Sequence, residues 1–363
     1  MKKIVLAIMA VFSISAAQAQ DSLSTESWFK KNKAFQNLDV SVTAGTTGIG
    51  IDVASKIGDY VQLRAGYEFM PRFQTGIFFP VEVGGQPAKA YDSNGNRIES
   101  RFDKLSKLLT EITGFQVEDE IEMVCKPTLN NFKFLVDVFP FKENKHWHFT
   151  AGFYWGPSMF AKAENSTAAM TSLVAVGLYN SVYYHAVNDL PLYDNITIVN
   201  EEMRSKLMEY GRMGFPIGKF SHDVYGYFNE DVYCREFGNP DYKYGEIIHH
   251  KGDYGLIHKK GESYMLEPDA DGMVKVNAKS NSFKPYLGFG YGGRLLKDRD
   301  DWHVSFDAGA MFWGGTPSLY THDGVNLTKD IEGAKGKVGD WIDFIGGFKV
   351  YPVLSVRFTK TLF

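Results

Sequence analysis

The sequence predicts an all-β membrane protein, an antiparallel transmembrane β-barrel of about eight strands (8–10), with long loops that carry short helices. Three observations lead to this prediction. The chain begins with an export signal, and its strand-like segments alternate strictly between apolar and polar residues. Several of these segments are also long enough to cross a bilayer as tilted strands.

The first residues have the order of parts that a Sec-type signal peptide requires. Lys2 and Lys3 precede an apolar run over residues 4–12, and Ala17-Gln18-Ala19 forms a small-x-small cleavage site. The apolar run is shorter than the roughly 20 residues that a membrane-spanning helix needs. We therefore expect cleavage near Ala19 and localisation in the cell outer membrane.

This signal sets the predicted organisation of the chain. No later segment is long, apolar and uninterrupted, since polar residues divide the best candidate, residues 168–187, so a helical inner-membrane protein is not expected. The expected parts are a signal peptide (residues 1–19), an N-terminal segment (20–37) and a barrel (38–363) with inserts at about 71–129, 157–284 and 314–347.

Composition excludes one class of partner and leaves two architectures open. The formal net charge is −4 with both signs well mixed, so no basic surface for nucleic acid is expected. Aromatic residues make up 15% of the chain and glycine is abundant, with 36 residues. Both values suit a membrane barrel and would equally suit a soluble β-sandwich.

The alternation of residue types favours the barrel. In residues 60–70, one face carries Val61, Leu63, Ala65, Tyr67 and Phe69, and the other carries Gln62, Arg64, Gly66 and Glu68. Soluble strands usually have about five or six residues, whereas membrane strands need about 9–11. The same pattern recurs in residues 131–139, 146–156, 285–293, 301–313 and 354–359. Aromatic residues near the ends predict an interfacial girdle of Tyr60, Trp147, Trp155, Trp302 and Trp313.

The number of strands stays open at this level. Seven strands are clear, whereas a closed barrel with both termini on the periplasmic side needs an even number. The alternation changes phase across Gly45-Thr46-Thr47-Gly48, which indicates a bulge or a tight turn. Either residues 39–48 contain a separate first strand, or the middle insert supplies one from residues 262–266 or 273–276.

The inserts carry apolar stripes at helical spacing. One stripe is Phe102, Leu105, Leu108, Leu109 and Ile112; a second is Met203, Leu207 and Tyr210, after Asn200 as the N-cap; a third is Val338, Trp341, Ile342 and Ile345. We expect these helices to pack within the loops or over the barrel mouth, and a binding cap is the alternative.

The polar strand faces predict a side-chain network inside the barrel. A small barrel fills its own lumen, so mixed charges there are expected to pair rather than to line a pore or an active site. The predicted network comprises Arg64, Glu68, Asp137, His148, His303, Asp307 and Arg357, with Gln62 and Lys133 on the same faces.

No enzymatic, metal or cofactor site is expected. His148, His303 and Asp307 resemble parts of a hydrolase, but the two histidines are expected to be solvated at one rim, and no motif places a nucleophile beside a base. No set of three or four metal ligands converges. The residues Asp92-Ser93-Asn94-Gly95 are read as a turn rather than as a calcium loop.

The chain has two cysteines, Cys125 and Cys234. Both fall in predicted loops, and an exported protein can hold a disulfide. A bridge between them is therefore an open prediction, because sequence alone does not give their separation.

The strand motifs resemble those of small bacterial outer-membrane β-barrel proteins of uncharacterised function. The similar segments are residues 44–51, 63–67, 285–292, 305–309 and 349–358, and the inserts match nothing in that family. The resemblance implies a small barrel with no established activity, and the long aromatic-rich inserts suggest a Bacteroides-like relative. One departure is that Phe363, the terminal aromatic residue, is out of phase with Leu354, Val356 and Phe358.

These observations predict a non-enzymatic outer-membrane barrel with a structural or binding role through its loops. A narrow channel for small solutes is the alternative, and a hydrolase acting on lipid or peptide ranks third. The expected partners are outer-membrane lipids and the barrel insertion machinery, with an external ligand of unknown type.

Overall fold

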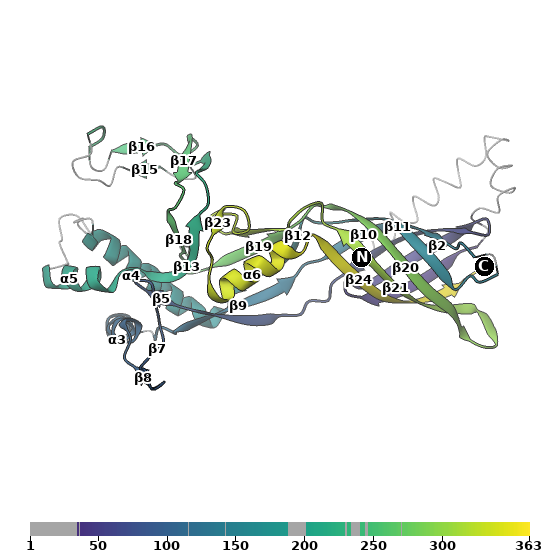
Figure 1. Ribbon diagram of the computed structural model, residues 1–363, viewed down its shortest axis with the longest axis horizontal. Coiled ribbons are helices and arrows are strands. Elements are labelled where there is room, and N and C mark those ends of the chain that lie inside the picture. The colour runs from purple at the N-terminus through teal and green to yellow at the C-terminus, as the bar shows by residue number, and fades with distance from the viewer. Residues whose placement is uncertain are drawn as a thin grey trace.

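Eight strands close into an antiparallel barrel in which each strand pairs with the next barrel strand along the chain (Figure 1). This computed structural model describes residues 35, 37–114, 116–141, 143–187, 201–228, 231–233, 240–243, 246–269 and 271–363. The predicted signal peptide and Asn200 lie outside them. The barrel strands are β1 (Asp39–Gly45), β2 (Gly48–Ile57), β3 (Val61–Phe69), β10 (Asn130–Val138), β11 (Trp147–Trp155), β20 (Phe283–Leu296), β21 (Arg299–Phe312) and β24 (Val350–Thr361). The predicted fold class is confirmed.

The tight turn between β1 and β2 accounts for the missing strand. Gly45 pairs with Gly48 across Thr46 and Thr47, and β1 also pairs with β24 to close the barrel. Gly48 has φ 114°, and a Cβ there would overlap the carbonyl group of Phe69, so only glycine fits. The phase change in the sequence is therefore this turn, and the strands of the middle insert lie outside the barrel.

The two ends of the barrel differ in their connections. At one end lie the chain segments around Leu38 and Leu362, which are hydrogen-bonded to each other, together with the three short connections after β2, β10 and β20. The three long inserts leave from the opposite end and gather into one region beyond it (Figure 1). We call these the termini end and the insert end.

The outer wall of the barrel is apolar, as the alternation predicts. Along β3, Gln62, Arg64 and Glu68 are buried, while Tyr67 and Phe69 are exposed. Exposed apolar side chains continue around the wall, among them Val42, Ile51, Phe149, Leu287, Phe306, Leu354 and Phe358. A belt of this kind is the surface that lipid covers. Among the described residues, no helix is long and apolar enough to cross a membrane.

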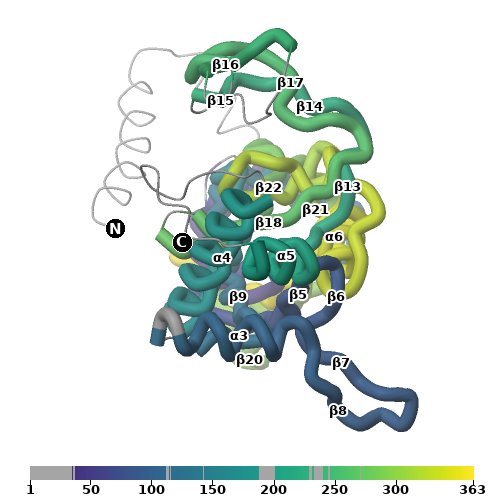
Figure 2. The backbone as a smooth tube through the Cα atoms, turned by 90° about the vertical axis from the view of Figure 1, so that its left-hand side faces the viewer, coloured from purple at the N-terminus to yellow at the C-terminus, as the bar shows by residue number. Residues whose placement is uncertain are grey.

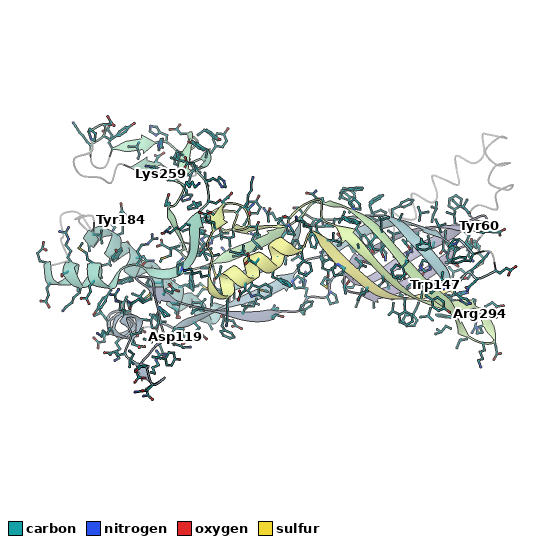
Figure 3. The ribbon with its side chains drawn as sticks, viewed as in Figure 1. Tyr60, Asp119, Trp147, Tyr184, Lys259 and Arg294 are labelled. Carbon is teal, nitrogen blue, oxygen red and sulfur yellow. The ribbon has the colours of Figure 1, made fainter. Side chains whose placement is uncertain are left out.

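Aromatic side chains lie near the strand ends, with one exception to the predicted girdle. Tyr60 and Trp147 lie at the termini end (Figure 3), and Trp155 is exposed at the end of β11 that leads to its insert. Trp313 is only 3% exposed and packs against Phe160, so its place in the girdle was predicted wrongly. Trp313 follows the inward-facing residues of β21 at the same two-residue spacing, which explains why its side chain is buried.

Five barrel strands continue beyond the barrel as an open sheet, which we call the extension sheet. Its strand order, β22-β19-β12-β9-β4, repeats the barrel order β21-β20-β11-β10-β3. The strands are β4 (Thr75–Pro80), β9 (Glu120–Pro127), β12 (Met159–Asn165), β19 (Lys275–Lys279) and β22 (Ser318–Thr321). The insert region is therefore built on prolonged β-hairpins of the barrel wall rather than on separate loops.

The remaining insert elements cover and extend this sheet. A second sheet has the order β18-β13-β5-β6, with β23 beside β13. Its strands are β5 (Glu82–Val83), β6 (Gln86–Pro87), β13 (Met213–Phe220), β18 (Ser263–Leu266) and β23 (Ile331–Glu332). Short hairpins are formed by β7 (Ala90–Tyr91) with β8 (Arg97–Ile98), β14 (Val224–Tyr227) with β17 (Tyr254–His258), and β15 (Val232–Tyr233) with β16 (Ile247–His249).

Helices form the far end of the insert region and one side of it. They are α3 (Arg101–Thr113), the 3-10 turn η2 (Thr167–Ala169), α4 (Met170–Val187), α5 (Glu201–Tyr210) and α6 (Gly336–Gly347). Figure 2 shows α3, α4 and α5 gathered at the far end, while the hairpins β7–β8 and β14–β17 project to opposite sides. The largest apolar core joins α3, α4 and the two sheets through residues such as Leu105, Leu173 and Phe220.

Candidate functional site

A network of ion pairs crosses the lumen towards the termini end. Arg64 Nη2 lies 2.9 Å from Asp137 Oδ1, and Arg357 bridges Asp137 (3.6 Å) to Asp307 (3.4 Å). His148 Nε2 lies 2.6 Å from the other oxygen of Asp307. All five side chains are buried. They come from β3, β10, β11, β21 and β24, so this network ties five strands together across the lumen.

A second ion cluster lies nearer the insert end. Lys133 of β10 lies 2.9 Å from Asp52 of β2 and also pairs with Glu68 of β3. Glycines make room for it, because a Cβ on Gly66 would overlap Asp52 and one on Gly50 would overlap Glu68. These contacts explain why charged and glycine residues alternate around the inner wall.

The buried charges of the lumen are close to balance. The buried cations are Arg64, Lys133, Lys284 and Arg357, the buried carboxylates are Asp39, Asp52, Glu68, Asp137 and Asp307, and His148 lies among them. Buried charges are tolerated when they are paired. Lys284 differs from the other three cations, because its amine donates hydrogen bonds to Asn131 Oδ1 and to the carbonyl group of Ser282 rather than to a carboxylate. An interior in which most charges are paired favours structural filling over a field that selects ions.

An apolar layer lies beside these clusters on the inner wall. It consists of Leu135, Tyr154, Tyr286, Met311 and Val353, each at most 3% exposed. The rings of Tyr154 and Tyr286 meet edge to face with centroids 5.4 Å apart. An eight-stranded barrel has an interior that side chains of this size can fill, so we take this layer as the expected barrier of the lumen.

A polar recess opens on the termini side of this barrier. It has a volume of about 460 Å³, and its walls include Asp39, Lys56, His303, Arg294 and Arg357. His148 also borders the recess but is only 2% exposed. The expectation that both histidines are solvated is therefore wrong for His148, which the adjacent Asp307 holds inside the barrel.

The seven predicted network residues fall into three groups. Arg64, Asp137, His148, Asp307 and Arg357 join one network, and Glu68 belongs to the Lys133 cluster. His303 lines the recess and has no ion pair with either cluster. Asp52, Tyr154 and Tyr286 complete the interior, and their inward phase in the alternating strands was the signal available for them.

The interior face of the wall continues into an apolar cavity above the barrel. The cavity lies between the extension sheet and α6 and has a volume of about 210 Å³. Val338, Trp341, Ile342 and Ile345 line it from α6, which is the third apolar stripe that the sequence marks. We call this space the α6 cavity. This stripe packs over the extension sheet, which agrees with the expectation that the insert helices pack locally. The packing leaves a cavity between α6 and the sheet.

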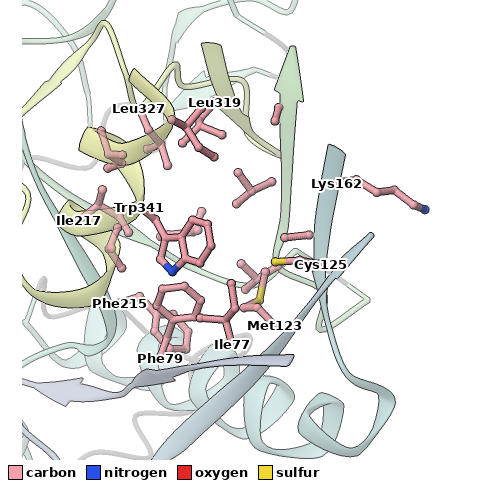
Figure 4. A pocket seen from close by; sticks show the side chains of 18 of the residues that line it. Ile77, Phe79, Met123, Cys125, Lys162, Phe215, Ile217, Leu319, Leu327 and Trp341 are labelled. Atoms are coloured by element: carbon pink, nitrogen blue, oxygen red, sulfur yellow. The ribbon is translucent and has the colours of Figure 1, made fainter. Parts of the chain in front are cut away.

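The α6 cavity has almost no polar surface. Its lining includes Ile77 and Phe79 of β4, Met123 of β9 and Phe215 of β13, which lie together beside Trp341 in Figure 4. The one charged lining residue, Lys162, directs its amine away from the space. Such surroundings offer a ligand dispersion contacts and no charged partner.

Cys125 borders the α6 cavity from β9 and is half-buried. Burial raises the pKa of its thiol, because the thiolate loses hydration there. It has no disulfide partner within the described part of the chain, and Cys234 lies outside that part, so the bridge between them stays a prediction.

The side chains of His148, Asp307 and Ser305 lie close together in the lumen. His148 directs Nε2 at Asp307, and the hydroxyl of Ser305 is hydrogen-bonded to Asp307 and Arg357 rather than to the histidine. Over the ranges that the structure describes, no three metal-ligating side chains converge. Asp92 accepts hydrogen bonds from the N–H groups of Asn94 and Asn96, which is the predicted turn.

The fold and the interior together define a membrane-spanning β-barrel with buried ion pairs in its lumen and an elaborated insert region. No family model matches the chain, and no curated protein matches it. Among solved structures, the chain is similar to the crystal structure of Acinetobacter baumannii CarO2, with 14% identity, 90% of this chain and 98% of that chain covered, and a TM-score of 0.35. For Acinetobacter baumannii CarO the values are 13%, 89%, 97% and 0.34. Likeness at this level carries no information on function.

Proposed function

We propose that the protein is a non-conducting outer-membrane barrel that holds a binding region on the outer surface of a Gram-negative cell. The buried apolar layer inside the barrel, together with the apolar cavity of the insert region, is the observation that carries this proposal. The ion pairs stabilise the barrel, and ligand contact belongs to the insert region. A Bacteroides-like origin and insertion by the barrel assembly machinery remain part of the proposal.

Chain geometry supports the placement in an envelope membrane. Only helices and closed barrels satisfy all backbone hydrogen bonds inside lipid, and this barrel is closed with an apolar outer face. Barrels of this class carry short turns on the periplasmic side and long loops outside. The insert end is therefore expected to face outward, and proteolysis of intact cells should cleave insert segments and spare the turn between β20 and β21.

A planar-bilayer experiment tests the closed lumen. Wild-type protein should give no conductance steps, whereas Tyr286→Ala and Met311→Ala should give them by removing side chains from the apolar layer. Leu287→Ala is the matched control, because Leu287 neighbours Tyr286 in β20 and faces lipid. Steady conductance of the wild type, unchanged in the layer variants, would contradict the proposal.

A narrow channel is the second candidate, and the polar recess of about 460 Å³ favours it. In that case the recess would be the periplasmic vestibule of a pathway past the layer. Wild-type conductance that is altered by Arg294→Ala, at the wall of the recess, would support the channel.

A further inference from the structure

The α6 cavity has the shape of a binding site because small side chains form part of its floor. Ala161 of β12 pairs with Ala278 of β19, and Ala163 pairs with Cys125 of β9, so neighbouring positions of the extension sheet carry short side chains. Opposite them, α6 presents large ones, including Trp341. A packed core would alternate large and small residues across this gap so that they interdigitate.

The chemistry of the lining selects an uncharged ligand. The cavity offers no paired charge, and the amine of Lys162 is directed outward, where it lies 3.6 Å from Glu164. A carboxylate or ammonium group would lose its hydration inside and gain no partner. A hydrocarbon group loses nothing comparable and gains dispersion contacts with the walls.

The volume limits the ligand to a small molecule. An engineered apolar cavity of about 150 Å³ in another protein stays dry and binds benzene. The α6 cavity, at about 210 Å³, has room for one ring with a short alkyl substituent or for a branched chain of similar bulk. A long lipid chain would extend well beyond it.

We propose that the α6 cavity is a binding site for small, uncharged hydrocarbons of about one ring in size. This inference rests on the proposed binding function and names the ligand class for it. α6 contributes the aromatic and branched side chains that cover the ligand, and the extension sheet contributes the floor.

Binding should be measured by calorimetry on the full-length protein in lipid nanodiscs, with propylbenzene as the probe. Empty nanodiscs give the heat of partition into lipid, which is subtracted. The matched probe is 3-phenylpropionate, which keeps the ring and adds a charge. We expect propylbenzene to bind and 3-phenylpropionate to bind on the order of tenfold more weakly or not at all, because a charge is unpaired in this cavity.

Two variants locate the binding. Ala278→Leu places extra carbon atoms inside the cavity and should weaken propylbenzene affinity by about tenfold or more, as competition for space in an apolar pocket requires. Ala310→Leu makes the same change on the lipid-facing side of β21 and should leave affinity unchanged. The thermal midpoint of Ala278→Leu should be equal to or above the wild-type value, because the side chain fills real space.

An independent readout uses Cys125 in a Cys234→Ser background. Propylbenzene should slow alkylation of the Cys125 thiol by N-ethylmaleimide, since the thiol borders the occupied space. The proposal is overturned if propylbenzene does not bind, if both probes bind alike, or if Ala278→Leu binds as the wild type does. If the wild-type barrel does not conduct and propylbenzene does not bind, only the proposed ligand class is wrong. If the wild-type barrel conducts, the proposed function itself is wrong.

Discussion

His148 Nε2 lies 2.6 Å from Asp307 Oδ1 across the strand that separates them, and Gly290 of that strand permits this contact. The three residues form one row, since Gly290 pairs with His148 on one side and with Asp307 on the other. A Cβ on Gly290 would overlap the His148 ring and lie 2.5 Å from Asp307 Oδ1. The glycine is therefore a requirement of the side-chain network.

Gly290→Ala should destabilise the barrel by about 1–3 kcal/mol, because the added methyl group forces the buried pair apart. The urea midpoint in micelles, followed by the gel mobility of the folded form, measures this. Gly293→Ala is the control, since a Cβ there would approach only the ring of His146, at 3.1 Å. Equal midpoints for both variants would show that the pair tolerates the methyl group.

Asp137→Ala should cost about 3–5 kcal/mol, because it removes the carboxylate that neutralises buried Arg64 and Arg357. The same unfolding assay applies. Asp301→Ala removes solvent-accessible ion pairs with Arg299 and Lys360 and should change stability by less than about 1 kcal/mol. If Asp137→Ala is as stable as Asp301→Ala, the lumen charges are hydrated rather than paired.

The barrel wall was largely predictable, because period-two alternation directly reports which residues face lipid and which face the lumen. The closure through β1 was harder to predict. β1 has only seven residues, and only Thr46 and Thr47 separate it from β2, so in the sequence the two strands look like one segment whose alternation changes phase. Trp313 was wrongly assigned to the interfacial girdle because tryptophan near a strand end is typical of a membrane interface. Its position in the alternation of β21 places its side chain on the inward face.

Ser100 caps α3, and its replacement should weaken that helix. The N–H of Asp103 donates to Ser100 Oγ (3.0 Å), and the N–H of Ser100 donates to Asp103 Oδ2 (2.8 Å). Ser100→Ala should cost about 1 kcal/mol, seen as faster amide exchange in α3. Ser93→Ala, in an exposed turn, is the control and should leave exchange unchanged.

The same cap should make α3 sensitive to acid. Burial alone would raise the pKa of Asp103, but the hydrogen bonds from Ser100 and Arg97 outweigh it and hold that pKa below its ordinary value. The stabilisation is therefore complete above the ordinary pKa of an aspartate, about 4, and is lost as the pH falls through the lower folded value. Asp103→Asn should remove this dependence. Acid loosening of α3 that persists in the variant would assign the effect to another group.

Alkylation of Cys125 should have its pH midpoint above that of an exposed thiol, because burial raises its pKa and only the thiolate reacts. The rate of N-ethylmaleimide addition in the Cys234→Ser background, measured against pH and beside glutathione, tests this. A midpoint at or below that of glutathione would mean that the thiol is solvated.

The candidate site was less predictable than the wall. The stripe Val338, Trp341, Ile342 and Ile345 could be recognised in sequence, but a stripe does not reveal what it faces. The floor comes from β12 and β19, which are distant in the chain and meet only because β11 and β20 are neighbours in the barrel. The sequence gives only a weak indication that the barrel strands extend into the insert region, because a bulge near Phe160 shifts the apolar–polar alternation of β12.

The extension sheet fixes how far the cavity stands from the bilayer. A strand rises about 3.3 Å per residue, so the eight residues of β9 span roughly 25 Å. Removing two residues from each paired strand would lower the cavity by about 7 Å and keep its lining, whereas removing one would turn the apolar lining to the opposite face of the sheet. The distance between the cavity and the bilayer can therefore change only by two residues per strand at a time if the apolar lining is to keep facing the cavity.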